Sequence, residues 1–262
     1  AALGTLFSRW TMVLFMAING KNQKSFKRYN RKLLRVKLQK TLFKKIISLG
    51  FPSALQMFFE VTFFTSAIWM SGMLGKNPQA ANQIALNLTS MTYMVALGLG
   101  VTAMIRVGNE KGRQDFISLR RVAISTFFLV FLMSSLFCLF FVVTHDLLPW
   151  LYLDGNPPEI SSDVFTVVEI ASDLILIAAF FQIADGLQAV VLGALRGIQD
   201  VIIPAFLIFI SYGAIGFPVS YYLGLKTEWG ASGIWMGLLT GLTLSALLLL
   251  LRFQYLSQKL DS

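Results

Sequence analysis

The chain has 262 residues, of which 56% are hydrophobic and only 13% are charged, and its mean hydropathy is +0.68. Soluble globular domains carry about 25% charged residues, so this composition excludes an ordinary soluble protein. The formal net charge is +9, which favours an anionic partner, either nucleic acid or the anionic surface of a lipid bilayer.

Apolar stretches too long for a soluble core recur along the chain. A transmembrane helix needs about 20 predominantly apolar residues, whereas the strands of a membrane β-barrel would alternate apolar and polar residues over about ten positions. The sequence shows the first pattern, so we expect an all-α membrane protein with one six-helix set and an additional helix before it. The seven apolar stretches are 1–19, 42–74, 80–105, 122–143, 164–195, 201–225 and 230–253.

The basic residues predict how these helices are oriented. The segment 21–45 holds eleven Lys and Arg residues and no acidic residue. Placing it in the cytoplasm assigns nineteen basic residues to the cytoplasmic side and only Lys76 and Lys226 to the outside, as the positive-inside rule requires. The net charge is then a signal of topology and of attraction to anionic lipid, and nucleic acid is disfavoured. The acidic residues assigned to the outside are Asp146, Asp154, Glu159, Asp163 and Glu228.

Three parts follow along the chain. We expect residues 1–19 to form the last helix of a preceding lobe, residues 20–45 a basic cytoplasmic linker, and residues 46–262 a six-helix lobe. We expect a further lobe to precede this segment in the complete protein. Within the linker, the apolar residues favour an amphipathic helix at the membrane interface; they are Leu33, Leu34, Val36, Leu38 and Leu42.

Two acidic residues lie deep in the apolar stretches. Glu60 is 15 residues from Lys45 and 16 from Lys76, which places it near the midplane at a rise of about 1.5 Å per residue. Asp185 lies 11 residues before Arg196 and is also well inside. A carboxylate at the bilayer centre costs about 2.5–3.5 kcal/mol on insertion scales, so such residues face a bundle interior and mark functional sites.

Two further acids lie nearer the outer surface. Glu169 and Asp173 are four residues apart on one face of the same predicted helix. Asp173 precedes Asp185 by twelve residues, which turns it to a different face. The pair is either a solvated helix end or an outer vestibule that attracts cations, and the sequence leaves both readings open.

Amide side chains accompany the two deep carboxylates. One lies a turn before Glu60, one lies three residues after Asp185, and two form a polar pair on the intervening helix. Carboxylates and amides from three helices would form a hydrated cavity in which a proton, Na⁺ or an organic cation competes for binding. The alternative is a structural hydrogen bond or an internal ion pair. The amides are Gln56, Gln83, Asn87 and Gln188.

Three long segments resemble the C-terminal half of multidrug and toxic compound extrusion (MATE) transporters. They are "GFPSALQMFFEVTFF" (50–64), "GKNPQAANQIALNLTSMTYMVALGLGVTAMIRVGNEKG" (75–112) and "FFQIADGLQAVVLGALRGIQD" (180–200). The resemblance implies twelve helices in two six-helix lobes around a central cavity, with this chain supplying the sixth helix, the linker and helices seven to twelve. It also implies that Glu60 and Asp185 match the motif glutamate and aspartate that bind the coupling cation in the bacterial Na⁺-coupled branch.

Two positions depart from the family pattern. Phe181 stands where the tenth-helix motif often has Tyr, which removes an oxygen ligand, and Asn82 stands where His is common. Both H⁺ and Na⁺ stay open as the coupling cation, with Phe181 favouring H⁺. Phe181 also belongs with Met57, Phe58 and Phe59 to a set that would accept flat cationic drugs through cation–π and apolar contacts.

The sequence therefore predicts a cation-coupled antiporter of the plasma (inner) membrane that exports organic-cation drugs or toxic metabolites by alternating access. Its partners would be membrane lipids and the preceding N-terminal lobe, with no cofactor besides H⁺ or Na⁺, the latter bound as a metal by Glu60 and Asp185. One alternative is a lipid-linked saccharide flippase of the related superfamily, whose cavity would carry cationic residues. A second is an intramembrane enzyme, although one His and one Cys exclude a conventional zinc site or Cys/His dyad.

A glycine pattern near the C-terminus predicts close helix packing. In "GIWMGLLTG" (233–241), Gly233, Gly237 and Gly241 recur every four residues and so share one helix face. Small residues at this spacing let two helix backbones approach closely in membrane bundles.

Overall fold

The computed structural model describes residues 2–22, 39–152 and 162–259. Six helical segments in these ranges are long and apolar enough to cross a membrane, judged by length and composition. This confirms the predicted all-α fold. The elements are α1 (Ala2–Asn22), α3 (Lys40–Leu74), α4 (Lys76–Arg113), α5 (Phe116–Thr144), the 3₁₀ helix η1 (Leu148–Tyr152), α6 (Ser162–Gly197), α7 (Ile202–Phe209), the π-helical η3 (Ile210–Gly216), α8 (Phe217–Leu225) and α9 (Gly230–Lys259).

The chain divides into two compact units, residues 1–47 and residues 48–262. The first unit contains α1, whose apolar core is the short stretch Leu6–Ile18. α1 ends at Asn22 and α3 begins at Lys40, so both helices extend into the range predicted as the linker. Of the predicted interfacial helix, residues 33–38 lie outside the described residues, as do Asp154 and Glu159, whereas Leu42 lies in α3.

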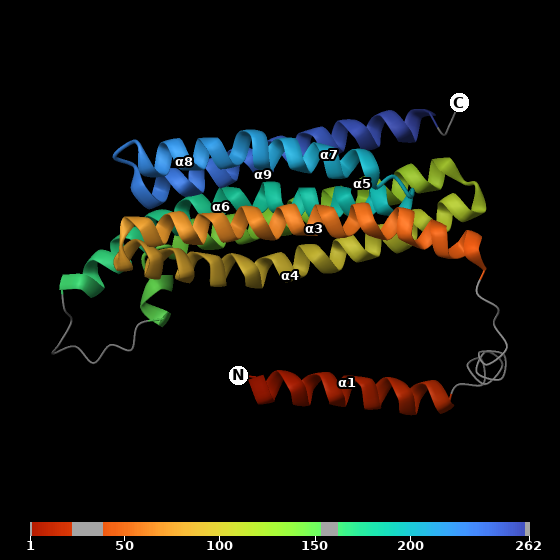
Figure 1. Cartoon of the computed structure of the whole chain (residues 1–262), viewed down its shortest axis with the longest axis horizontal. Helices are drawn as coiled ribbons and strands as arrows, with labels where there is room; N and C mark the ends of the chain where they lie inside the picture. Colours follow the sequence, from red (N-terminus) through yellow and green to blue (C-terminus); the bar gives the residue numbers. More distant parts are fainter. Residues whose placement is uncertain (1, 23–38, 153–161, 260–262) are drawn as a thin grey trace. The chain divides into compact units, whose positions relative to one another are not determined.

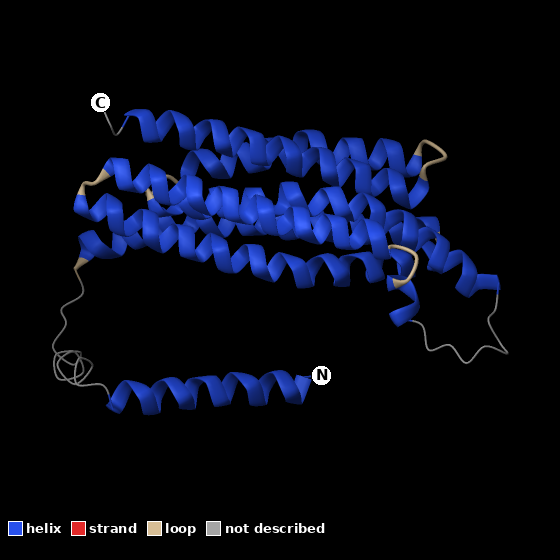
Figure 2. Cartoon of the chain, turned by 180° about the vertical axis from the view of Figure 1, so that it is seen from behind, coloured by secondary structure: helices blue, strands red, loops and turns tan. Residues whose placement is uncertain are grey.

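α6 is the central helix of the second unit. It packs against α4, α5 and α9, and its buried residues extend from Val167 to Leu195. The helices of this unit run side by side along one direction (Figures 1 and 2). We call the end that carries Arg196, Arg113 and Arg252 the basic end, and the end that carries Lys76 and Asp163 the opposite end.

Glycines bring α4 and α6 into direct backbone contact. A Cβ atom on Gly193 of α6 would lie 2.2 Å from the carbonyl oxygen of Gly100 on α4, and one on Gly197 would lie 2.7 Å from that of Met104. α9 packs against α8 in the same manner, because a Cβ on Gly237 would lie 2.2 Å from Ser220 Oγ. The structure thus confirms the predicted glycine face on α9.

The fifth membrane span is interrupted by the π-helical segment η3. η3 lies between α7 and α8, and Pro218 occupies the second position of α8, where a missing N–H is tolerated. The wider turn places Tyr212 in the core, where it is 2% exposed. Such π segments are common at functional sites, and the apolar pattern of residues 201–225 does not reveal this one.

α3 is attached in a different way, through side chains. Within the described part of the chain, no helix approaches α3 over a long stretch as α4 approaches α6. Phe63 stacks on Tyr212 with ring centroids 4.6 Å apart, and Phe59 lies 4.9 Å from Phe209. Much of the remaining surface of α3 is exposed and apolar, including Trp69.

Candidate cation site between α3, α4 and α6

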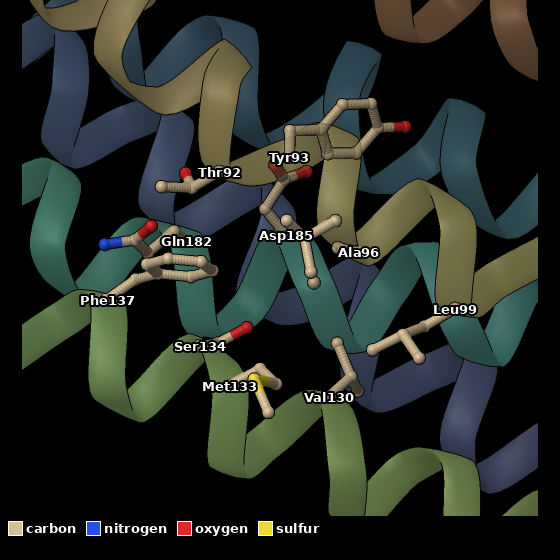
Figure 3. Close-up of a pocket in the computed structure, with 12 residues that line it drawn as sticks. Thr92, Tyr93, Ala96, Leu99, Val130, Met133, Ser134, Phe137, Gln182 and Asp185 are labelled. Carbon is tan, nitrogen blue, oxygen red and sulfur yellow. The ribbon is translucent and has the colours of Figure 1, made fainter.

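The two deep carboxylates lie near each other inside the bundle. The Tyr93 hydroxyl on α4 donates a hydrogen bond of 3.2 Å to Glu60 Oε1 on α3. Asp185 on α6 is 6% exposed and points toward Tyr93 (Figure 3). Tyr93, which bonds Glu60, also lines a small cavity together with Asp185. Three helices therefore meet at a concentration of negative charge.

Neither carboxylate belongs to an ion pair among the described residues. Arg196, in the last turn of α6, is attracted electrostatically to Glu60, but its guanidinium donates to Gln56 Oε1 from Nε at 3.2 Å and from Nη2 at 2.9 Å. A buried charge without a permanent partner is costly. A mobile cation or a proton would offset that cost.

A small cavity lies beside Asp185. Its volume is about 10 Å³, which is close to the minimum for one water molecule. Thr92 and Tyr93 from α4, Ser134 from α5 and Gln182 from α6 contribute polar groups to its wall (Figure 3). Both amide atoms of Gln182 are buried without a hydrogen-bond partner among the described residues, so they are free to bind a water molecule or cation.

The amides predicted to line a shared cavity have separate roles. Gln56 is fully buried and donates from Nε2 to the Val201 carbonyl at 2.7 Å. Gln188 Oε1 accepts a 2.6 Å hydrogen bond from the Tyr212 hydroxyl. The structure thus gives both side chains protein partners inside the packed bundle.

Gln83 and Asn87 lie elsewhere. They line a hollow of about 400 Å³ at the opposite end of the bundle, together with Tyr152 and Asp163. The structure does not bring these two amides to the cavity beside Asp185, so the predicted convergence of amides from three helices is not what it shows.

Phe181 is packed in the core. It is 1% exposed, and its ring centroid lies 5.9 Å from that of Phe64 and 5.4 Å from that of Trp235. The indole of Trp235 donates to Asn82 Oδ1 at 2.9 Å. Both positions that depart from the family pattern are therefore part of one buried contact region between α3, α4, α6 and α9.

The remaining predicted residues lie on exposed surfaces. Glu169 and Asp173 are exposed along the part of α6 nearest the opposite end. Met57 and Phe58 are exposed on α3. The outer vestibule at Glu169 and Asp173 and the drug contacts of Met57 and Phe58 therefore stay predictions.

Sequence reasoning missed four residues of this region: Tyr93, Gln182, Arg196 and Tyr212. Gln182 and Arg196 had a signal, because they lie three residues before and eleven residues after Asp185, on the same side of the helix. Tyr93 and Tyr212 had none, since an aromatic residue in an apolar stretch usually contributes to packing.

The fold and the site define a class of protein: a multi-pass helical membrane protein that holds ionisable side chains between its helices. Among the described residues, no group of three or more His, Cys, Asp or Glu side chains comes together as a metal cage. A metal ion at Glu60 and Asp185 would therefore need further oxygen ligands, such as those of Tyr93 and Gln182.

The MatE family model matches residues 52–222, and the chain belongs to this family. Family membership confirms the resemblance read from the motifs. Members of the family are transporters, which supports the prediction that the chain is not an enzyme.

Several curated relatives are similar over most of this chain. The Probable multidrug resistance protein NorM of Agrobacterium fabrum is 35% identical over 215 residues, covering 82% of this chain and 45% of the relative. The Multidrug resistance protein MdtK of Proteus mirabilis is 34% identical over 223 residues, covering 83% and 47% respectively. The chain spans about half the length of the curated relatives it matches.

Solved structures share the fold. The eukaryotic MATE transporter AtDTX14 is 21% identical with a TM-score of 0.81, covering 97% of this chain and 56% of that one. A multidrug resistance MATE family transporter of the MOP superfamily in its outward-facing conformation is 17% identical with a TM-score of 0.74, covering 87% and 49%. At these identities the likeness concerns the fold alone.

Proposed function

We propose that this chain forms the C-terminal half of a cation-coupled antiporter that exports organic cations by alternating access. The single observation that carries the proposal is the pair Glu60 and Asp185, two carboxylates near Tyr93 inside a membrane bundle with no ion-pair partner among the described residues. The names of the relatives, which are multidrug resistance proteins, support the substrate class.

The coupling step uses the repulsion between the carboxylates. A proton or Na⁺ that binds at Glu60 and Asp185 reduces their negative charge, which releases a bound cationic drug and lets α3 approach α6. When the ion leaves on the other side, the negative charge returns and favours a new cationic substrate. Tyr93 orients Glu60 for this exchange by its hydrogen bond.

The cavity beside Asp185 fits an ion or a water molecule, and a drug is far too large for its volume of about 10 Å³. We therefore place the drug between the exposed apolar face of α3 and the N-terminal half of the transporter. Phe58 and Met57 on that face would supply aromatic and thioether contacts to a flat cation.

The phenylalanine at position 181 favours H⁺ over Na⁺. A hard cation is held by several oxygen ligands, and Phe181, packed between Phe64 and Trp235, supplies none. A proton needs no ligand cage, only a carboxylate and a hydrogen-bond partner. The acidic lining also disfavours a saccharide flippase, whose phosphate-bearing substrate calls for cationic residues.

We further propose that the basic end faces the cytoplasm and that the protein lies in the plasma membrane with its six spans in lipid. The excess of basic residues on the side of the linker supports this orientation.

The test is ethidium efflux from vesicles that contain the full-length protein, driven either by a pH gradient or by a Na⁺ gradient. Glu60→Gln and Asp185→Asn keep the side-chain size and remove the charge, so we expect each to reduce efflux by roughly tenfold or more while membrane insertion stays normal. Glu228→Gln, in the exposed turn between α8 and α9, is the matched control. Normal efflux by the Glu60→Gln, Asp185→Asn double variant would overturn the proposal.

A further inference from the structure

Arg196 is a partly buried cation that binds a neutral partner although a carboxylate is near. Its guanidinium donates two hydrogen bonds to the amide oxygen of Gln56, at 3.2 and 2.9 Å. Arginine usually pairs with carboxylates through its planar fork of donors. The partner seen here is therefore a weaker one than Glu60 would be.

The structure holds Gln56 rigidly in this role. Its Nε2 donates to the Val201 carbonyl at the start of α7, and its side chain is fully buried. The turn before Val201 is itself fixed, because Lys111 of α4 donates to the Ile198 carbonyl and Arg252 of α9 pairs with Asp200 at 2.8 Å. The amide oxygen is thus presented to Arg196 at a fixed place.

Glu60 lies one helical turn beyond Gln56 on α3. Residues four apart on a helix have Cβ atoms about 5–6 Å apart, and Arg196 is attracted electrostatically to Glu60 from its present position. The proposed movement is therefore a change in the rotamer of the long Arg196 side chain, over about one helical turn of α3.

The groups that act on Glu60 come from each element packed around it. Tyr93 of α4 donates a hydrogen bond to it, Asp185 of α6 repels it, and the Tyr212 hydroxyl of η3 lies within its field. The positive charge in this set is Arg196, and it occupies the basic end of the site.

We propose that Arg196 is a resident counter-charge that binds Gln56 while the coupling cation occupies Glu60, and turns to Glu60 when that cation leaves toward the basic end. The inference rests on the function proposed above and adds a positioning residue to it. By competing for Glu60, Arg196 weakens cation binding and so promotes release. Gln56 limits this competition by holding the guanidinium away.

The two residues should therefore shift cation affinity in opposite directions. In full-length protein, efflux is measured against NaCl concentration at constant pH and against pH in Na⁺-free buffer. Arg196→Gln should lower the half-saturating concentration of the driving cation by roughly fivefold or more, a typical size for coupled sites. Gln56→Met, which keeps the volume and removes the amide, should raise it. Arg121→Gln, an exposed cation of α5 near the same end, should leave it unchanged.

If Arg196 and Gln56 had only a structural role, Arg196→Gln and Gln56→Met would be impaired alike. A shift of the half-saturating cation concentration in the same direction for both variants, or no shift, would therefore overturn the counter-charge. Arg196→Lys keeps the charge but loses the fork that makes two hydrogen bonds to Gln56, so it should raise the half-saturating concentration as Gln56→Met does. If Arg196→Gln fails to insert, a value for Arg196→Lys below that of the wild type would overturn the counter-charge. Loss of efflux in Glu60→Gln with unchanged affinity in Arg196→Gln would refute this inference alone. Normal efflux in Glu60→Gln would refute the proposed function as well.

Discussion

The helix pair α4–α6 and the single helix α3 are held in the bundle by different means. α4 and α6 touch through their backbones, because glycines remove the side chains that would separate them. α3 is attached to its neighbours through aromatic rings, the Tyr93–Glu60 hydrogen bond and the Gln56 contacts. Asp185 belongs to the first region and Glu60 to the second.

This difference determines which carboxylate can move. Backbone contacts at van der Waals distance leave no room for sliding, so Asp185 stays fixed relative to Tyr93. α3 is joined by side chains, whose rotamers change more readily than a backbone contact, so the proposed coupling would move Glu60 rather than Asp185. In the proposed antiport, two carboxylates whose separation changes would bind a cation with variable strength.

The largest expected effect comes from breaking the fixed pair. Gly193→Val would place a Cβ atom 2.2 Å from the Gly100 carbonyl oxygen, which forces α6 away from α4. We expect roughly 3 kcal/mol or more of destabilisation, at the upper end of overpacking effects. Thermal melting in detergent, followed by size-exclusion chromatography, should show loss of the folded, monodisperse protein.

The matched control is Gly98→Val on α4. A Cβ atom at Gly98 meets nothing within 4 Å, so this variant should melt close to the wild type. Equal stability of the two valine variants would show that the α4–α6 contact is not tight, and the contrast with α3 would then fail.

A smaller effect is expected from Tyr93→Phe, which removes the hydroxyl that joins α4 to Glu60 on α3. A hydrogen bond to a charged group contributes about 1.5–3 kcal/mol, and this one is long at 3.2 Å. We expect about a tenfold change in the half-saturating concentration of the driving cation, with only a small fall in melting temperature.

Tyr222→Phe on the exposed side of α8 is the control for that variant, and it should not alter efflux. If Tyr93→Phe lowered the melting temperature strongly and left cation dependence unchanged, Tyr93 would be a packing residue, and α3 would be held independently of its glutamate.

The sequence predicts the regions of this molecule unevenly, for physical reasons. Spans and the depth of Glu60 and Asp185 follow from hydropathy and flanking charges, since helix rise converts residue count into depth. The direction in which a polar side chain faces is harder to predict from the sequence, because a polar residue suits both a hydrated cavity and a buried hydrogen bond to the protein. Gln56 and Gln188 were thus expected at a cavity, whereas the structure pairs them with protein groups. The role of Tyr93 depends on tertiary contact alone.

The smallest effect should come from a site remote from both regions. Asp115 caps α5 by accepting a 2.9 Å hydrogen bond from the Ser118 backbone N–H, and this bond lowers the pKa of the Asp115 carboxyl below its ordinary value of 3.8. A depressed folded-state pKa means that the cap stabilises the protein above the unfolded-state pKa. That stabilisation is lost as the pH falls through the folded-state value.

Asp115→Ala should therefore melt slightly below the wild type at neutral pH, and the difference should shrink in acid once the wild-type carboxyl is protonated. Efflux should be unchanged, because α5 is positioned by its packing against α6 rather than by its cap. Glu228→Ala, at an exposed carboxylate in the turn between α8 and α9, is the control and should melt close to the wild type at neutral pH. A melting difference that grew in acid would contradict the cap. A loss of efflux would show that the cation site responds to the end of α5, and that mobility within the lobe is not confined to α3.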